Sequence, residues 1–205
     1  NGRPVSAANT LIKRTDGASA SATVTINCAG SGKAFNVTQA DASSTFTLEG
    51  VTIRGGNSES SGGSLFVEGG SLTLRDCTFI DSQSLASTAG GSFEGGGAVA
   101  ALRVLRLQVD GCDFSDCRAP NGAGGGILVA FEAAAEGREE GGDGRSMQPW
   151  GVRRARVVEA EGEAMSVLWS RFDGCRADTQ GGGVAVQVEA WSGDGFSVLV
   201  QDTAF

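Results

Sequence analysis

Short runs of alternating apolar and polar residues occur along the chain, and one of them is present in five copies. The copies span residues 45–53, 71–79, 106–114, 165–172 and 197–205. Within a copy every second side chain is apolar, as in the run from Leu72 to Leu74 and the run from Leu107 to Val109. A period of two residues predicts β-strands that bury one face.

The copies also carry similar residues at equivalent positions, counted back from the closing Ile or Phe. Position minus five is Leu48, Leu74, Val109, Val167 and Val200, and position minus two is Val51, Cys77, Cys112, Ser170 and Thr203. The closing residues lie 26, 35, 58 and 33 positions apart. A fixed offset indicates one repeated backbone shape, and a coil of short strands accepts unequal spacing because extra residues leave as corner loops.

A glycine cluster that leads into an apolar run follows four of the copies. The clusters begin at Gly62, Gly95, Gly124 and Gly181, and the apolar runs begin at Leu65, Ala98, Ile127 and Val184. Glycine suits a sharp corner before a strand. We therefore expect each repeat to hold a strand, a bend, a second strand, a glycine corner and a third strand. Stacking such units at about 4.8 Å per rung gives a parallel β-helix.

The alternation of a C-x-F or S-x-F strand with a Gly-Gly-Gly-apolar strand resembles the repeats of the polymorphic outer membrane proteins, whose motifs are G-G-A-[ILV] and F-x-x-N. The segments 24–37 and 50–55 also resemble coils of such proteins. Those repeats belong to the right-handed, pectin-lyase-like β-helices, so the resemblance implies this fold for roughly residues 22–205. The chain departs from F-x-x-N, because Ser82, Cys117 and Cys175 replace the Asn.

We expect an all-β fold, a right-handed parallel β-helix (solenoid) of about five coils with variable corner loops and one long insertion. Residues 1–21 are expected to be an N-terminal flanking segment, and residues 22–205 the β-helix. The 33 Gly among 205 residues, without the period of collagen, favour many turns. Neither end shows an amphipathic cap helix, so we expect the chain to be a segment of a longer one.

The net charge of −8 narrows the set of partners. Nucleic-acid binding needs a basic stripe, and docking on anionic lipid needs basic residues, so neither is expected. No run of about 20 apolar residues is present, so we expect no direct membrane insertion by this segment. The partners that we expect are other protein subunits or cell-surface glycans.

The five cysteines follow the repeat. Cys77 and Cys112 occupy one position on successive copies, and Cys117 and Cys175 occupy another. Together with Phe79, Phe114 and Phe172 they form an expected structural ladder. Side chains stacked at about 4.8 Å are slightly wide of the Cβ separation of about 3.5–4.5 Å in a disulfide. We prefer small buried residues in a stack, with a rung-to-rung disulfide as the alternative. The absence of His and of C-x-x-C argues against a metal site, and no cofactor is expected.

The longest insertion spans about 131–164 and is rich in both signs of charge. We interpret it as a projecting hairpin or flexible arm, with a solvated loop as the alternative. Trp150 within it and Trp191 near a second corner are candidate contact residues, because loops on a rigid scaffold carry binding.

A further set of candidates comes from β-helix enzymes. Polysaccharide lyases and galacturonases of this fold place acidic and basic side chains on adjacent strands, and here Asp81 and Asp116 share one repeat position while Arg118 and Arg176 share another. The same residues are ordinary in turns, and we prefer that reading. Asn36 begins an Asn-Val-Thr glycosylation sequon.

We expect a non-catalytic structural scaffold. It is a rod segment of a larger surface-exposed or secreted adhesin-like protein, or a subunit of a larger assembly; the adhesive role is what the resemblance implies. The expected location is extracellular or at the cell surface. The alternatives are a polysaccharide-binding or polysaccharide-cleaving β-helix protein, of lyase or glycosidase type, and an intracellular structural assembly.

Overall fold

A computed structural model describes residues 4–5, 10–13, 24–39, 41, 43–87, 94–131, 165–188, 198–201 and 203–204. Within these ranges every regular element is a β-strand, and the strands form four sheets in which all paired strands are parallel. The expectation of an all-β chain of stacked parallel strands is therefore confirmed. The arrangement is compatible with a parallel β-helix.

We number the sheets I to IV in the order in which the chain enters them from β5 onward. Sheet I holds β2 (Thr10–Lys13), β5 (Thr45–Glu49), β9 (Ser71–Arg75), β13 (Arg106–Asp110), β17 (Met165–Leu168) and β21 (Val198–Gln201). Sheet II holds β3 (Val24–Asn27), β6 (Val51–Arg54), β10 (Thr78–Ile80), β14 (Asp113–Ser115) and β18 (Arg171–Asp173).

The other two sheets differ greatly in strand length. Sheet III holds the two-residue strands β7 (Asn57–Ser58), β11 (Gln83–Ser84), β15 (Arg118–Ala119) and β19 (Arg176–Ala177). Sheet IV holds β1 (Pro4–Val5), β4 (Phe35–Thr38), β8 (Leu65–Glu68), β12 (Val99–Val104), β16 (Ile127–Phe131) and β20 (Val184–Val188).

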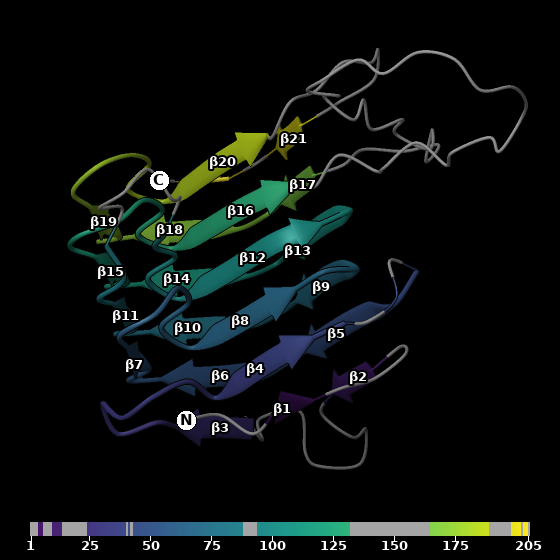
Figure 1. Ribbon diagram of the computed structural model, residues 1–205, viewed down its shortest axis with the longest axis horizontal. Coiled ribbons are helices and arrows are strands. Elements are labelled where there is room, and N and C mark those ends of the chain that lie inside the picture. Colours follow the sequence, from purple (N-terminus) through teal and green to yellow (C-terminus); the bar gives the residue numbers. More distant parts are fainter. Residues whose placement is uncertain are drawn as a thin grey trace, which may run out of the picture.

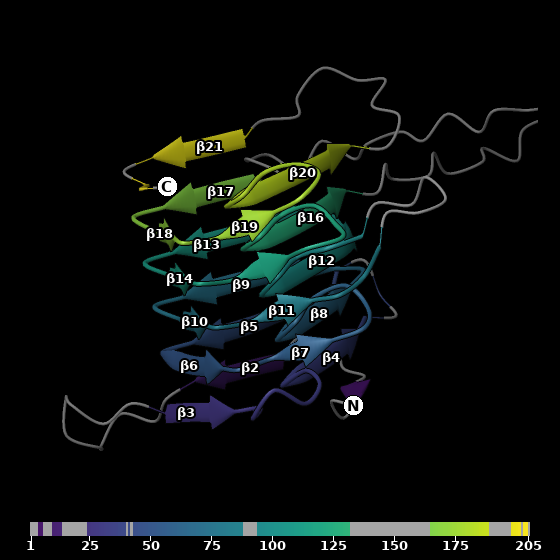
Figure 2. The ribbon, with the colours of Figure 1, turned by 90° about the vertical axis from the view of Figure 1, so that its left-hand side faces the viewer.

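From β5 onward the chain passes through sheets I, II, III and IV in turn and then returns to sheet I. We call each such passage a layer; β5–β8, β9–β12, β13–β16 and β17–β20 are four successive layers. Figure 1 shows the strands of sheet IV stacked in one direction, and Figure 2 shows the same stack turned by 90°. Strands β1 to β3 lie at one end of the stack and β20 and β21 at the other.

The register of the layers follows the sequence repeat. In sheet I, Leu48 pairs with Leu74, Leu74 with Val109, and Val109 with Val167. In sheet II, Phe79 pairs with Ile53 on one side and Phe114 on the other. Each copy of the repeat therefore supplies one strand of sheet I, a bend and one strand of sheet II.

Two features were not expected from the sequence. Each layer has a fourth strand, in sheet III, which lies between the strand of sheet II and the glycine corner. Strands of only two residues leave no periodic pattern to detect. In addition, β1 and β2 lie before residue 22 and pair with β4 and β5, so strand pairing begins within residues 1–21.

The interior is a continuous apolar column that runs through all the layers. The rings of Phe79, Phe114 and Phe172 stack with centroids 4.9 and 4.6 Å apart and interplanar angles of 6° and 3°. Phe79 and Phe114 are fully buried and Phe172 is nearly so. The three phenylalanines are thus in vertical register, because in-register parallel strands place equivalent side chains over one another.

Three bends of each layer keep their shape from layer to layer. A residue with positive φ occupies the same place in each: Gly50, Asp76, Gly111 and Trp169 between sheets I and II; Gly55, Asp81, Asp116 and Gly174 between sheets II and III; Gly62, Gly96, Gly124 and Gly181 before sheet IV. The amides at these bends donate to the layer above, as from Asp81 to the carbonyl oxygen of Ser115 at 2.9 Å. Hydrogen bonding between layers therefore continues around the bends.

The glycine corners have a second requirement, which is close approach of backbone to backbone. A Cβ on Gly97 would overlap the carbonyl oxygen of Gly125 in the next layer, and a Cβ on Gly125 would overlap that of Gly182. Since the obstacle is backbone, no side-chain movement relieves it.

The layers differ in length at the connections that precede and follow the sheet IV strands. The bend between sheets I and II takes one or two residues in every layer, and the bend between sheets II and III takes two. The connection from β11 to β12 spans residues 85–98, and that from β16 to β17 spans residues 132–164, all of which lie outside the described residues. The unequal spacing of the repeat copies therefore arises at the two ends of the sheet IV strands.

The aromatic column gives the first testable prediction. Replacing Phe114 with Ala should lower the free energy of unfolding by about 3–5 kcal/mol, because it removes a ring stacked on both sides and leaves a cavity between layers. Urea denaturation of the purified chain measures this change. Ser115→Ala, on the outward side of the same strand, should change stability by no more than about 0.5 kcal/mol. Equal effects of the two substitutions would contradict the stacked interior.

Candidate functional site

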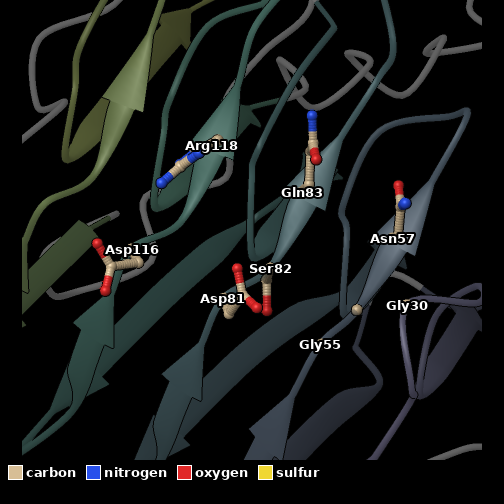
Figure 3. Close-up of a pocket in the computed structure, with 9 residues that line it drawn as sticks. Gly30, Gly55, Asn57, Asp81, Ser82, Gln83, Asp116 and Arg118 are labelled. Atoms are coloured by element: carbon tan, nitrogen blue, oxygen red, sulfur yellow. The ribbon is translucent and has the colours of Figure 1, made fainter.

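The sequence candidates Asp81, Asp116 and Arg118 line one shallow depression on the outer surface. The remaining lining comes from Gly30, Gly55, Gly56, Asn57, Ser82 and Gln83. Figure 3 shows the two carboxylates at equivalent bends of neighbouring layers, with Gln83 and Arg118 on the short strands β11 and β15 that follow these bends. The depression thus follows the bend between sheets II and III and the short strands of sheet III.

The left-handed backbone at this bend sets where the carboxylates lie. Asp81 and Asp116 have φ of 51° and 53°, and both are exposed. In the next layer Gly174 takes the place of Asp116, and a Cβ there would lie 2.7 Å from Oδ1 of Asp116. Asp tolerates positive φ better than most residues with a side chain. These aspartates therefore have a conformational reason to be present that is independent of any ligand.

The two arginine candidates lie in sheet III rather than in a turn. Arg118 and Arg176 pair in register between β15 and β19, and both are exposed. Only Arg118 lines the depression; Arg176 does not. The structure therefore brings together two carboxylates and one guanidinium of the four charged candidates.

Ser82 stands behind the depression and belongs to the interior. Its hydroxyl hydrogen-bonds to that of Ser64 at 2.7 Å, and both side chains are fully buried. This contact joins the bend before sheet III to the glycine corner before sheet IV, so Ser82 has a structural role.

The other candidates are placed as follows. Asn36 lies in β4 beside Phe66 and is half-buried. Trp150 and Trp191 lie outside the described residues, as does nearly all of the 131–164 insertion. The structure therefore offers no geometry for the two tryptophan candidates.

A third tryptophan, Trp169, was missed by the sequence reasoning. It lies at the bend between β17 and β18 with φ of 50°, and 66% of it is exposed. Gly50 and Gly111 occupy the same place in earlier layers. Its position three residues before the end of a repeat copy is the signal that could have shown it, since Gly or Asp stands there in the preceding copies. A bulky residue in this backbone region is unusual.

A lysine–serine cluster was missed as well. The Lys33 ammonium donates to the hydroxyl oxygens of Ser58 at 2.8 Å and Ser60 at 2.5 Å, and it lies 5.5 Å from the ring centroid of Phe66. Burial lowers the pKa of Lys33. Lys33 occupies the place that Gly63 has in the next layer.

All five cysteines are free thiols. Cys77, Cys112 and Cys117 are buried, and Cys28 and Cys175 are half-buried. The thiols of Cys77, Cys117 and Cys175 each donate to a carbonyl oxygen of the layer below, on Leu48, Phe79 and Phe114 respectively. The cysteines therefore satisfy backbone acceptors at the bends as well as filling the interior.

The paired thiols influence one another. A hydrogen bond from the Cys112 thiol lowers the pKa of Cys77, and one from the Cys117 thiol lowers the pKa of Cys175. The donors respond in the opposite direction, so the pKa values of Cys112 and Cys117 are raised well above the usual value. Burial alone raises the pKa of Cys28.

A metal-ligand cluster and a membrane-spanning helix are both absent from the described residues. No group of three or more His, Cys, Asp or Glu side chains that could hold a metal ion is found among them. No helix in this part of the chain is long and apolar enough to cross a membrane. Comparison with protein-family models, with curated proteins and with solved structures found no match.

The role of Asp116 can be tested directly. Asp116→Gly should leave the free energy of unfolding within about 0.5 kcal/mol, because Gly174 already occupies this bend in the next layer. Asp116→Val should lower it by about 1–2 kcal/mol, because a β-branched residue is strained at positive φ. Thr78→Val, in the neighbouring strand β10, is the control and should have little effect. Urea denaturation measures all three, and a large loss in the glycine variant would indicate a need for the carboxylate itself.

Proposed function

We propose that this chain is a right-handed parallel β-helix of about five coils that acts as a non-catalytic structural scaffold. It is a rod segment of a larger surface-exposed or secreted adhesin-like protein, or a subunit of a larger assembly. Its partners are other protein subunits or cell-surface glycans. Its location is extracellular or at the cell surface, and an intracellular assembly is the alternative.

The observation that carries this proposal is the unbroken aromatic and aliphatic column inside the layers. Phe79, Phe114 and Phe172 stack almost face to face along it. Each layer contacts its neighbours through backbone hydrogen bonds on four sides, so the layers resist sliding and bending together. A stiff stack with variable connections at the two ends of the sheet IV strands is suited to holding those connections apart and presenting them to a partner.

The outer surface supports a scaffold more than an active site. The depression lined by Asp81, Asp116 and Arg118 is shallow and open, and its two carboxylates occupy turn positions that favour Asp on backbone grounds. Glycoside cleavage needs two carboxyl groups held apart around a bound sugar, with one of them kept protonated. Two exposed carboxylates on adjacent layers do not supply the unlike environments which that chemistry requires.

A polysaccharide-binding or polysaccharide-cleaving protein is the second candidate, and one observation favours it. Trp169 is largely exposed and is held in a strained backbone conformation. A flat exposed indole ring offers an apolar face on which a sugar can stack. The depression and Trp169 together define what a glycan screen should test.

If the chain is a non-catalytic scaffold, it should cleave none of the polysaccharides in that screen. Incubation with acidic and neutral polysaccharides should release no new reducing ends and no unsaturated products, because the described residues assemble no catalytic acid–base pair. The double variant Asp81→Asn, Asp116→Asn is the matched control for cleavage, and Trp169→Ala is the control for binding. Cleavage by the natural chain that the double variant loses would overturn the scaffold and favour the enzyme.

The location gives a separate prediction. Antibodies raised against the purified chain should label intact cells of the source organism, or its culture medium, as strongly as permeabilised cells. Antibodies against an established internal protein serve as the control. Labelling that requires permeabilisation would refute the surface location and favour the intracellular assembly.

A further inference from the structure

Cys117 and Cys175 occupy the same place in two neighbouring layers. Each lies three residues after a stacked phenylalanine, Phe114 or Phe172, and those rings have centroids 4.6 Å apart. The register continues through the bend, because the Arg176 amide donates to the carbonyl oxygen of Cys117 at 2.9 Å. In-register neighbours on parallel strands have Cα atoms roughly 4.8 Å apart, inside the range of roughly 4.4–6.8 Å found for disulfides, and their Cβ atoms need to approach by a few tenths of an ångström to reach the roughly 3.5–4.5 Å of a bonded pair.

The two sulfur atoms point toward the same interior edge. The Cys175 thiol lies 3.4 Å from the carbonyl oxygen of Phe114, and the Cys117 thiol lies 3.6 Å from that of Phe79, one layer below. The neighbouring Cys117 side chain is the largest cause of the lowered pKa of Cys175. Both thiols lie at equivalent carbonyl groups of successive layers, so the two side chains are neighbours across one layer spacing.

The two cysteines differ in access to solvent. Cys117 is fully buried, whereas Cys175 is half-buried. A thiolate is the attacking species in disulfide exchange, and it must reach the external reagent. Cys175 has the access to solvent that this attack needs, and Cys117 lies one layer away, where a second attack would follow.

We propose that Cys117 and Cys175 form a reversible disulfide by exchange with a small external disulfide of the glutathione type. The Cys175 thiolate attacks one sulfur of that disulfide, releases one external thiolate and becomes a mixed disulfide. Cys117 then loses its proton and attacks the Cys175 sulfur, which releases the second external thiolate. Two protein thiols are oxidised and one external disulfide is reduced to two thiols, because the two protons lost by the cysteines are taken up by the two external thiolates.

Cys77 and Cys112 form a control pair within the same chain. They are related by one layer in the same way, since the Asp113 amide donates to the carbonyl oxygen of Cys77 at 2.9 Å. Their exposed fractions are 0% and 2%, so an external reagent has no path to either sulfur in the folded protein. We expect this pair to remain reduced under conditions that oxidise Cys117 and Cys175.

The link would join the layers on either side of the longest insertion. Residues 132–164 lie between Cys117 and Cys175 in the sequence, and the two cysteines are 58 positions apart. A bond between them ties the third layer to the fourth irrespective of what the inserted residues do. Closing so long a stretch of chain stabilises the folded state chiefly by restricting the unfolded one.

The two methionines make the test specific. Cyanogen bromide cleaves after Met147 and Met165, giving fragments 1–147, 148–165 and 166–205. Cys175 is the only cysteine in the last fragment, whereas Cys28, Cys77, Cys112 and Cys117 all lie in the first. Only a disulfide to Cys175 can join these two fragments, and a bond between Cys77 and Cys112 cannot.

The folded protein is treated with oxidised glutathione at low protein concentration, alkylated, unfolded and cleaved. We expect fragments 1–147 and 166–205 to migrate together without reductant and apart with it, and the intact mass to fall by two hydrogen atoms. The thermal midpoint of the oxidised protein should rise and return on reduction. Fragments that migrate separately, or glutathione that stays attached to Cys175, would overturn the proposal.

Three serine variants identify the partner of Cys175. Cys117→Ser and Cys175→Ser should each abolish the joining of fragments, and Cys77→Ser should leave it intact. Joining that persists in Cys117→Ser would assign another partner and refute the pair. Peptide mapping of the oxidised natural chain gives the same assignment without any substitution, so the test does not depend on the variants folding.

Discussion

The hydrogen bonding between layers is the constraint on which the rest of the structure depends. Every described strand pairs in parallel with the strand one layer away, and the amides at the bends continue the same pairing. Parallel pairing in register repeats one position over another, so a single choice of residue becomes a column. Inside the stack the column is Phe79, Phe114 and Phe172, and at the bend it is Gly55, Asp81, Asp116 and Gly174. Each residue must therefore be compatible with the equivalent residues in the layers above and below it.

Outward-facing side chains of sheet I also stack in columns, and these columns are charged instead of apolar. Lys13, Glu49, Arg75 and Asp110 pair in sequence across sheet I, and their charges alternate along the column. Opposite charges on adjacent strands are favourable, and like charges are unfavourable. Arg118 beside Arg176 in sheet III is an exception, and it lies where strands are only two residues long. The outward columns thus help to hold the register that the inward columns need.

The same stacking gives the cysteines two different surroundings. Cys77 and Cys112 are sealed within the layers, while Cys175 remains within reach of solvent beside the buried Cys117. Bends that place small polar or sulfur-containing side chains under a carbonyl oxygen satisfy that acceptor without an asparagine ladder. The presence of Ser82, Cys117 and Cys175 at this position of the repeat is therefore structurally coherent. It also places thiols one layer apart, which an asparagine ladder would not.

The sequence by itself determined the strands of sheets I and II, the glycine corners and the vertical register, because equal offsets such as Leu48, Leu74 and Val109 are a local signal of period two. It did not indicate the strands of sheet III or the pairing of β1 and β2, since two to four residues carry too little pattern to distinguish from a loop. Only the tertiary structure decided which candidates meet. Asp81, Asp116 and Arg118 line one depression and Arg176 does not, because repeat position alone does not say which surface residues of neighbouring layers border the same hollow.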